Sequence, residues 1–144
     1  MNDSIDAAMM MKDSYLCSQA VFATLGEQCG IERNQALKLS TGFGAGIARR
    51  GDICGAVSGA IMAIGLKHGN YEVHDVDARD KVFFLAQKLI EGIKARHGCH
   101  TCRGLTGIDF TKPEGLKLFE EKGIGEKICI KVIMDCVDTV KEIW

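Results

Sequence analysis

Apolar residues recur at helical spacing along much of this chain, and this periodicity constrains its fold more than any other feature. Near the carboxyl end, Ile130, Ile133 and Val137 step by three or four residues and share one helix face, a stripe that continues to Val140 and Trp144. No segment shows the alternation that is typical of a half-buried strand. We therefore expect one all-α domain over residues 1–144, a compact bundle of about six to eight helices.

The same helical spacing predicts where the helices lie along the chain. They cover Tyr15 to about Gln28, Asn34–Leu39, Cys54–His68, Val82–Ile93, a segment from Thr111 to about Gly123, and the terminal segment. Ser14 is the candidate N-cap of the first of these, and the order Thr111-Lys112-Pro113-Glu114 has the spacing of a capping box. Gly98 is expected to end the preceding helix, the one that covers Val82–Ile93. Gly55 and Gly59 lie four residues apart, which allows close approach to a neighbouring helix.

Composition excludes several classes of protein. The net charge is −1 with both signs interspersed, unlike the basic stripe of a nucleic-acid-binding protein. The beginning of the chain lacks the basic and apolar regions of a secretory signal. The longest apolar stretch, from Ile53 to Leu66, is shorter than the ~20 residues of a membrane span. We expect a cytoplasmic protein without membrane insertion, in which structural disulfides are disfavoured.

Seven cysteines in such a chain indicate metal binding or redox chemistry. Four of them are expected in or near the first turn of a helix, where free backbone N–H groups favour a thiolate. These four are Cys17, Cys54, Cys102 and Cys129. If four helix starts meet at one point, they provide the ligands of an iron–sulfur cluster or another metal ion. The alternative is that each cysteine is a small buried apolar residue.

The run that leads to Cys54 is rich in glycine and arginine. Its glycines match no nucleotide-binding fingerprint, so we interpret Gly44 and Gly46, together with Gly55, as positions where the backbone approaches a cofactor. Arg49 is expected to contact the cofactor as well. Arg49 and its neighbour Arg50 either lower the pKa of Cys54 or are surface charges.

The remaining cysteines support weaker interpretations. Cys99 and Cys102 form a CxxC with His97 and His100 nearby, which is compatible with a local zinc site. No βαβ pattern surrounds this CxxC, as a thioredoxin-like site would require. Cys136 follows Cys129 by two helical turns, a rise of ~10.5 Å, so these two cannot form a disulfide within an intact helix. Cys136 is expected to be a packing residue, and Cys29 to be structural.

The cysteine pattern resembles the C_GCAxxG_C_C family of redox-active proteins, defined by the signature Cys…CGAxxG…Cys…Cys. Its central motif stands here as Cys54-Gly55-Ala56-Val57-Ser58-Gly59, and Cys17 and Cys102 match the first and third cysteines. Cys129 is the best match for the fourth, with Cys136 as its rival. The resemblance covers about Ser14 to Val140. It implies a redox role for the four cysteines and an association with transporter genes. A similar domain in split-Soret cytochromes implies an iron–sulfur centre.

These observations predict three alternative functions. In the first, Cys17, Cys54, Cys102 and Cys129 bind an iron–sulfur cluster or other metal for electron transfer or redox sensing with an unknown redox partner. In the second, the protein is a metal-free thiol–disulfide redox protein whose catalytic thiolate is Cys54. In the third, it is a binding module for a transporter or a small ligand, and its cysteines serve packing only. The terminal apolar stripe would support a homodimer if it is not buried in the monomer.

Overall fold

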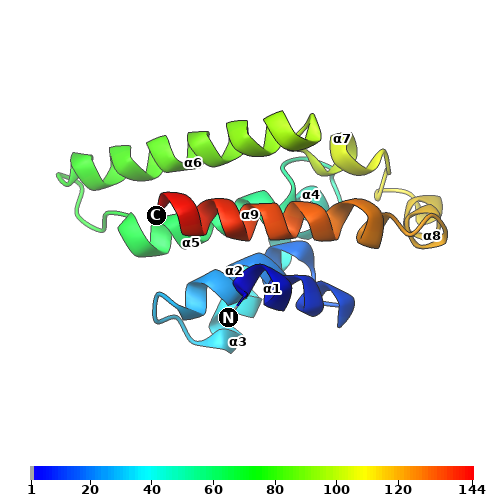
Figure 1. Cartoon of the computed structure of the whole chain (residues 1–144), viewed down its shortest axis with the longest axis horizontal. Coiled ribbons are helices and arrows are strands. Elements are labelled where there is room, and N and C mark those ends of the chain that lie inside the picture. Colours follow the sequence, from blue (N-terminus) through cyan, green and yellow to red (C-terminus); the bar gives the residue numbers. More distant parts are fainter. Residues whose placement is uncertain (1) are drawn as a thin grey trace.

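The computed structural model describes residues 2–144 and confirms the all-α prediction. These residues contain no β-strand, only an isolated bridge between Ile53 and Thr101. Right-handed α-helices dominate (Figure 1): α1 (Asp3–Lys12), α2 (Cys17–Glu27), α3 (Arg33–Ser40), α5 (Gly55–His68), α6 (Val76–His97), α7 (Cys102–Thr106), α8 (Pro113–Glu121) and α9 (Ile130–Ile143). A 3₁₀ turn (Thr41–Phe43), a short turn α4 (Gly44–Ile47) and a π-helical turn (Gly125–Cys129) connect them.

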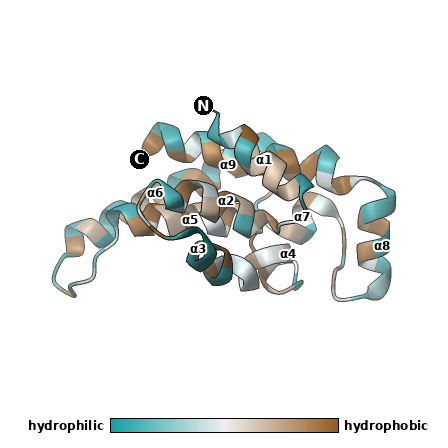
Figure 2. Cartoon of the chain, turned by 90° about the horizontal axis from the view of Figure 1, so that it is seen from below, coloured by the Kyte–Doolittle hydropathy of each residue, from teal (hydrophilic) through white to brown (hydrophobic). Residues whose placement is uncertain are grey.

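Helices α2 and α5 form the centre of the bundle, and their contact depends on small residues. A Cβ atom at Gly59 would lie 2.8 Å from the Ser18 carbonyl oxygen, closer than packed atoms approach. Figure 2 shows both helices at the centre of the molecule, with the hydrophilic α3 on the outside. The predicted close approach of α5 to a neighbouring helix is therefore confirmed.

The terminal helix α9 packs against α1, α5 and α6. Its apolar stripe is buried: Ile133, Val137 and Val140 are all 0% exposed. Trp144 ends the stripe, and the Lys67 ammonium lies 4.4 Å from the centre of its indole ring. The stripe belongs to the monomer core and is not an exposed dimerisation surface.

Two polar contacts tie α9 to neighbouring helices. In the first half of α9, Asp135 contacts His97 at the end of α6, with 2.7 Å between Oδ2 and Nε2. Near its end, Lys141 contacts Asp3 of α1 at 2.7 Å. None of the helices within residues 2–144 combines the length and the apolar character needed to cross a bilayer.

The prediction that Ser14 caps α2 is wrong. Ser14 has a φ of 76° and lies two residues before Leu16, which precedes the first helical residue, Cys17. The backbone N–H of Leu16 is instead satisfied by the side-chain oxygen of Gln19, at 3.0 Å. The helix begins later than predicted, and this places Cys17 at its first position.

The predicted capping box at Thr111 is also wrong, although the helix is present. The Thr111 N–H donates to the Asp109 carboxylate at 3.0 Å, and the Thr111 hydroxyl donates to the same oxygen. Lys112 therefore occupies the N-cap position of α8 without a side-chain hydrogen bond, and Pro113 starts the helix. Gly98 ends α6 as predicted, with a φ of 82°.

Candidate cysteine site

The structure brings the four cysteines that sequence singled out to one cavity of about 30 Å³. Cys54 and Cys102 are 9% and 8% exposed, while Cys17 and Cys129 are half-buried. The rest of the lining is mostly apolar: Gly55, Leu105, Thr106, Ile128 and Val132. Four thiols from separate segments of the chain therefore share a small, largely dry space.

Three of these cysteines lie at helix starts, as predicted. Cys17 and Cys102 are the first residues of α2 and α7, and Cys54 is the N-cap of α5. Backbone hydrogen bonds hold two of these starts together. The Cys54 N–H donates to the His100 carbonyl at 2.8 Å, and the Cys102 N–H donates to the Asp52 carbonyl at 2.7 Å. This short antiparallel pairing fixes Cys54 relative to Cys102.

Cys129 also lies near a helix start, as predicted, but inside a continuous helical run. It occupies the N-cap position of α9 and is the last residue of the π-helical turn Gly125–Cys129, which runs directly into α9. A π-turn adds one residue to the turn and so changes the direction in which the following side chains point. Ile128 and Cys129 both line the cavity. Cys136, the rival for this place, is fully buried in the hydrophobic core and does not line the cavity.

The turn α4, close to α7 in Figure 1, is wound in the left-handed sense. Five consecutive residues, 45–49, have φ between 50° and 71°, and only Gly46 among them is glycine. Left-handed winding costs an L-residue about 1–2 kcal/mol. Part of this cost is offset by hydrogen bonds within the loop. The Asp52 N–H donates to the Gly46 carbonyl at 2.9 Å, and the Gly51 N–H donates to the Ala45 carbonyl at 3.3 Å.

Cys17 is the thiol whose pKa is lowered in this site. Its pKa is lowered to about 7, first because the Cys54 thiol donates a hydrogen bond to its sulfur. The backbone N–H groups of Ala45, Ser18 and Gly55 add further hydrogen bonds and outweigh the opposing effect of burial. At neutral pH, Cys17 therefore carries much of the thiolate character of the site.

The pKa of Cys54 is not lowered, so Arg49 and Arg50 follow the second of the two alternatives that the sequence left open. The pKa of Cys54 is raised well above its ordinary value, because Cys54 shares its proton with Cys17 and because the thiol is buried. Arg49 and Arg50 are exposed, and Arg50 pairs with Asp52 at 3.5 Å. The arginines thus appear on the surface, and Cys17 replaces Cys54 as the candidate thiolate.

Burial keeps the other two sulfurs protonated. It raises the pKa of Cys102 to about 11 and that of Cys129 to about 12, and the nearby Cys17 sulfur adds to both shifts. Among the four sulfurs, Cys17 is therefore the one whose pKa is lowered, whereas the pKa values of the other three are raised.

The glycines expected to permit close approach do so in different ways. A Cβ at Gly55 would lie 2.5 Å from the Cys17 sulfur, and one at Gly46 would lie 2.7 Å from the Cys102 Cβ. Gly44 faces Leu16, with 2.9 Å from its ideal Cβ to the leucine Cδ1, and faces no cysteine. Gly46 and Gly55 therefore leave room for sulfurs or cysteine side chains, whereas Gly44 accommodates a leucine.

The CxxC does not form a local metal site. The Cys99 sulfur lies 3.2 Å from the Thr101 hydroxyl and against Gly104, where a Cβ would collide with it. Gly104 follows Cys102 by two residues, which places it about 200° around the helix and on the other side of α7 from Cys102. His97 is engaged by Asp135. The two sulfurs thus lie on opposite sides of α7.

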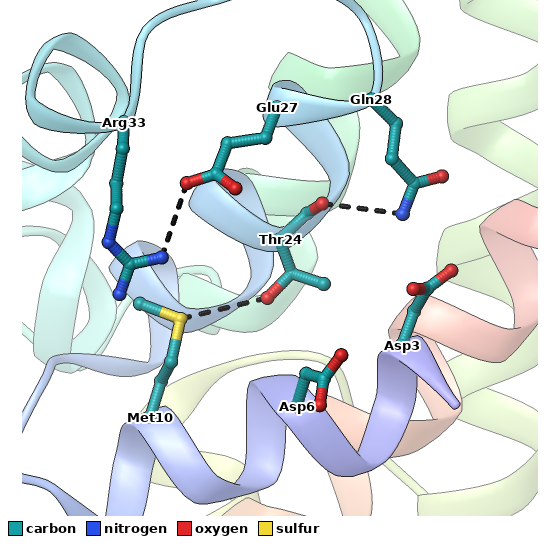
Figure 3. A pocket seen from close by; sticks show the side chains of 7 residues that line it. All are labelled: Asp3, Asp6, Met10, Thr24, Glu27, Gln28 and Arg33. Atoms are coloured by element: carbon teal, nitrogen blue, oxygen red, sulfur yellow. Dashed lines mark hydrogen bonds and ion pairs between the residues drawn. The ribbon is translucent and has the colours of Figure 1, made fainter. Parts of the chain in front are cut away.

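Wider clefts than the cysteine cavity lie elsewhere. One of about 400 Å³ is shown in Figure 3 and is lined by Asp3, Asp6, Met10, Thr24, Glu27, Gln28 and Arg33. Arg33 pairs with Glu27 at 3.2 Å, and Asp3 pairs with Lys141. This cleft contains no cysteine, and two of its three carboxylates are already neutralised by neighbouring cations.

The donor set of the cysteine cavity fits a thiolate-bound cofactor, because four cysteines are the usual ligands of iron–sulfur clusters and of structural zinc. Within residues 2–144, however, no three Cys, His, Asp or Glu side chains converge with the geometry of a single-ion site. Tetrahedral zinc at 2.3 Å from each sulfur requires the sulfurs to stand about 3.8 Å apart. An iron–sulfur cluster is larger than an ion and holds its ligands further apart.

A known protein family has the same cysteine arrangement as this chain. A family model described as "Putative redox-active protein (C_GCAxxG_C_C)" matches residues 15–143. The chain belongs to this family. No curated protein and no solved structure gives a significant match. Membership in the C_GCAxxG_C_C family supports a redox role for the site, and it agrees with the resemblance seen in the motif around Cys54.

Sequence reasoning missed two features of the site. The hydrogen bond from the Ala45 N–H to the Cys17 sulfur depends on the left-handed turn, for which the clustered glycines were the only sequence signal. The π-turn that presents Cys129 has no comparable signal, because its residues also suit an ordinary helix.

Proposed function

We propose that Cys17, Cys54, Cys102 and Cys129 bind an iron–sulfur cluster and that the protein transfers or senses electrons through it. The observation that carries this proposal is the single apolar cavity lined by all four thiols. A bound cluster would supply one-electron redox chemistry. Among residues 2–144 no side chains stand in the geometry of a single-ion site, which favours a cluster over zinc.

The chain itself contributes charge compensation and exclusion of water. The backbone N–H groups around Cys17 already face a sulfur that tends toward the thiolate, and such hydrogen bonds tune the potential of a cluster. Leu105, Ile128 and Val132 keep the surroundings apolar. Cys102 and Cys129 would have to lose their protons on binding, so cofactor uptake should release protons and become tighter as the pH rises.

A second candidate function follows from the contact between Cys17 and Cys54. In the metal-free protein, the Cys17 thiolate would attack an external disulfide and release one thiolate. The Cys54 thiol would then lose its proton and attack the Cys17 sulfur, forming an intramolecular disulfide and releasing the second thiolate. Two protein thiols are oxidised and one external disulfide is reduced. Here Cys54 is the resolving thiol and Cys17 the attacking one.

The deciding experiment is anaerobic purification followed by an absorption spectrum and analysis of iron, sulfide and zinc. Wild type is compared with Cys129→Ser and with Cys136→Ser, a matched control seven residues further along the same helix. We expect iron and sulfide in wild type and in Cys136→Ser, and their loss in Cys129→Ser. If the protein contained zinc and no sulfide, the cysteines would bind a metal ion and not a cluster. Wild-type protein free of metal would favour the dithiol function or a binding module.

A further inference from the structure

The left-handed turn at residues 45–49 is the most unusual backbone feature of the molecule. Four of its five residues have side chains that disfavour this conformation, since only Gly46 lacks a Cβ. A strained segment of this kind persists only where the surrounding structure over-determines it. Its contacts therefore indicate what holds it in place.

Those contacts lead to two of the four cysteines, to Cys102 directly and to Cys17 through its neighbour Leu16. Gly44 lies against the side chain of Leu16, the residue immediately before Cys17. Gly46 lies against Cys102, leaving no room for a Cβ between the Cys102 side chain and the Asp52 backbone N–H.

Hydrogen bonds extend this set of contacts to Cys54. The Gly46 carbonyl accepts from the Asp52 N–H at 2.9 Å, and the Asp52 carbonyl accepts from the Cys102 N–H at 2.7 Å. Cys54 follows Asp52 by two residues, and its own N–H donates to His100, two residues before Cys102. One continuous run of main-chain bonds therefore joins the left-handed turn to the starts of α5 and α7.

We infer that the left-handed turn at residues 45–49 is the positioning element of the cysteine site, with Gly46 as its essential residue. It packs against Leu16 beside Cys17 and sets the positions of Cys54 and Cys102 through Asp52. A right-handed turn in its place would separate Gly46 from Cys102. The inference rests on the proposed function for the identity of the cofactor, but the positioning itself is a property of the metal-free protein.

The test compares Gly46→Ala with Gly107→Ala. Gly107 has a φ of 71°, close to the 69° of Gly46, but a Cβ there meets nothing within 4 Å. Both variants bear a similar backbone cost, and only Gly46→Ala disturbs the turn. A third variant, Gly46→Ala with Ala48→Gly, returns a glycine to the exposed part of the turn and offsets that cost, which keeps the test informative if the single variant does not fold.

The first readout is amide hydrogen exchange in the metal-free, reduced protein. We expect the Cys54 and Cys102 amides to exchange about tenfold faster or more in both proteins that carry Gly46→Ala, with no such change in Gly107→Ala. The second readout is the iron and sulfide content of anaerobically purified protein. We expect about tenfold less of both in Gly46→Ala than in Gly107→Ala.

Unchanged exchange at Cys54 and Cys102 in a folded protein that carries Gly46→Ala would overturn the inference. So would equal effects of Gly46→Ala and Gly107→Ala on both readouts. Wild-type protein that binds no cluster would contradict the proposed function alone. The exchange experiment would still decide whether the turn positions the cysteines.

Discussion

The Cys17 and Cys54 sulfurs share a hydrogen bond that gives the two thiols opposite acidities. Cys54 donates, and the pKa of Cys17 falls to about 7 while that of Cys54 rises well above its ordinary value. The asymmetry has a backbone origin: three N–H groups face Cys17, whereas the Ala56 N–H is the one that faces Cys54. The same pair provides two ligands for a cluster and, without metal, an attacking and a resolving thiol.

Removal of the donor in this pair should slow the reaction of Cys17 with an alkylating reagent. In Cys54→Ala the Cys17 thiolate loses its strongest hydrogen bond, so its pKa should rise and its alkylation by iodoacetamide at pH 7 should slow by about tenfold or more. Mass spectrometry of metal-free, reduced protein measures the rate at each cysteine. Cys29→Ser is the control, because Cys29 lies outside the cavity. Faster or unchanged labelling of Cys17 in Cys54→Ala would contradict this assignment.

The stability of the metal-free protein should depend on pH in a way that reflects Cys17. A thiol has an ordinary pKa of 9.0, and folding lowers that of Cys17 to about 7. Its contribution is therefore fully present above pH 9 and is lost as the pH falls through 7. Cys102 and Cys129 act in the opposite sense, because their raised pKa values favour ionisation of the unfolded chain above pH 9.

We therefore expect the free energy of unfolding in urea to rise from pH 7 to about pH 9 and to fall above it. Circular dichroism at a series of pH values measures this profile. The difference between wild type and Cys17→Ser isolates the rise, since the variant lacks the titrating thiol. A difference that stays constant between pH 7 and pH 9 would show that Cys17 is not the thiolate.

Sequence patterns predicted the helices well where each helix depends on its own residues. The stripe through Ile133 and Val137 is buried as expected, and Gly98 ends α6. Caps were predicted poorly, because they depend on competition among nearby groups. At Thr111 the competitor is the Asp109 carboxylate, which accepts the hydrogen bonds of that threonine.

The part of the site that could be predicted from the sequence is the part in which cysteines lie at helix N-termini. Cys17 and Cys102 occupy such positions, and the motif at Cys54 indicated the family. Which cysteine has the lowered pKa depends on the Cys54 thiol and on N–H groups from three separate segments, at Ala45, Ser18 and Gly55, so the sequence spacing around Cys54 could not decide it. The left-handed conformation at Ala45 is likewise imposed by tertiary contacts, because alanine by itself disfavours it.

The close contact between α2 and α5 leads to a prediction about two glycines of one helix. Gly59→Ala should lower the free energy of unfolding by about 1–3 kcal/mol, because its Cβ would meet the Ser18 carbonyl oxygen at 2.8 Å and force the helices apart. Gly65→Ala, in the same helix with nothing within 4 Å of the new Cβ, should raise it by about 0.5–1 kcal/mol. Urea denaturation measures both. Equal effects of the two substitutions would mean that the helix contact is looser than described.

The hydroxyl of Ser18 provides a second check on the packing beneath the site. It is fully buried and donates to the Ser40 carbonyl at 2.7 Å, which ties α2 to the end of α3 just before the glycine-rich loop. Ser18→Ala should cost about 1–2 kcal/mol, because a buried hydrogen bond between two elements is lost. Ser58→Ala is the matched control, since the buried Ser58 hydroxyl bonds only to carbonyls of its own helical turn, Cys54 and Gly55.

We expect Ser58→Ala to change the free energy of unfolding by less than about 0.5 kcal/mol, because those carbonyls keep their helical partners and alanine favours a helix. Thermal and urea denaturation of both variants give the comparison. Ser18→Ala should also speed amide exchange in residues 41–49, since the loop loses its nearest anchor to α2. A larger loss of stability in Ser58→Ala than in Ser18→Ala would place the critical hydrogen bond inside α5 and not between α2 and α3.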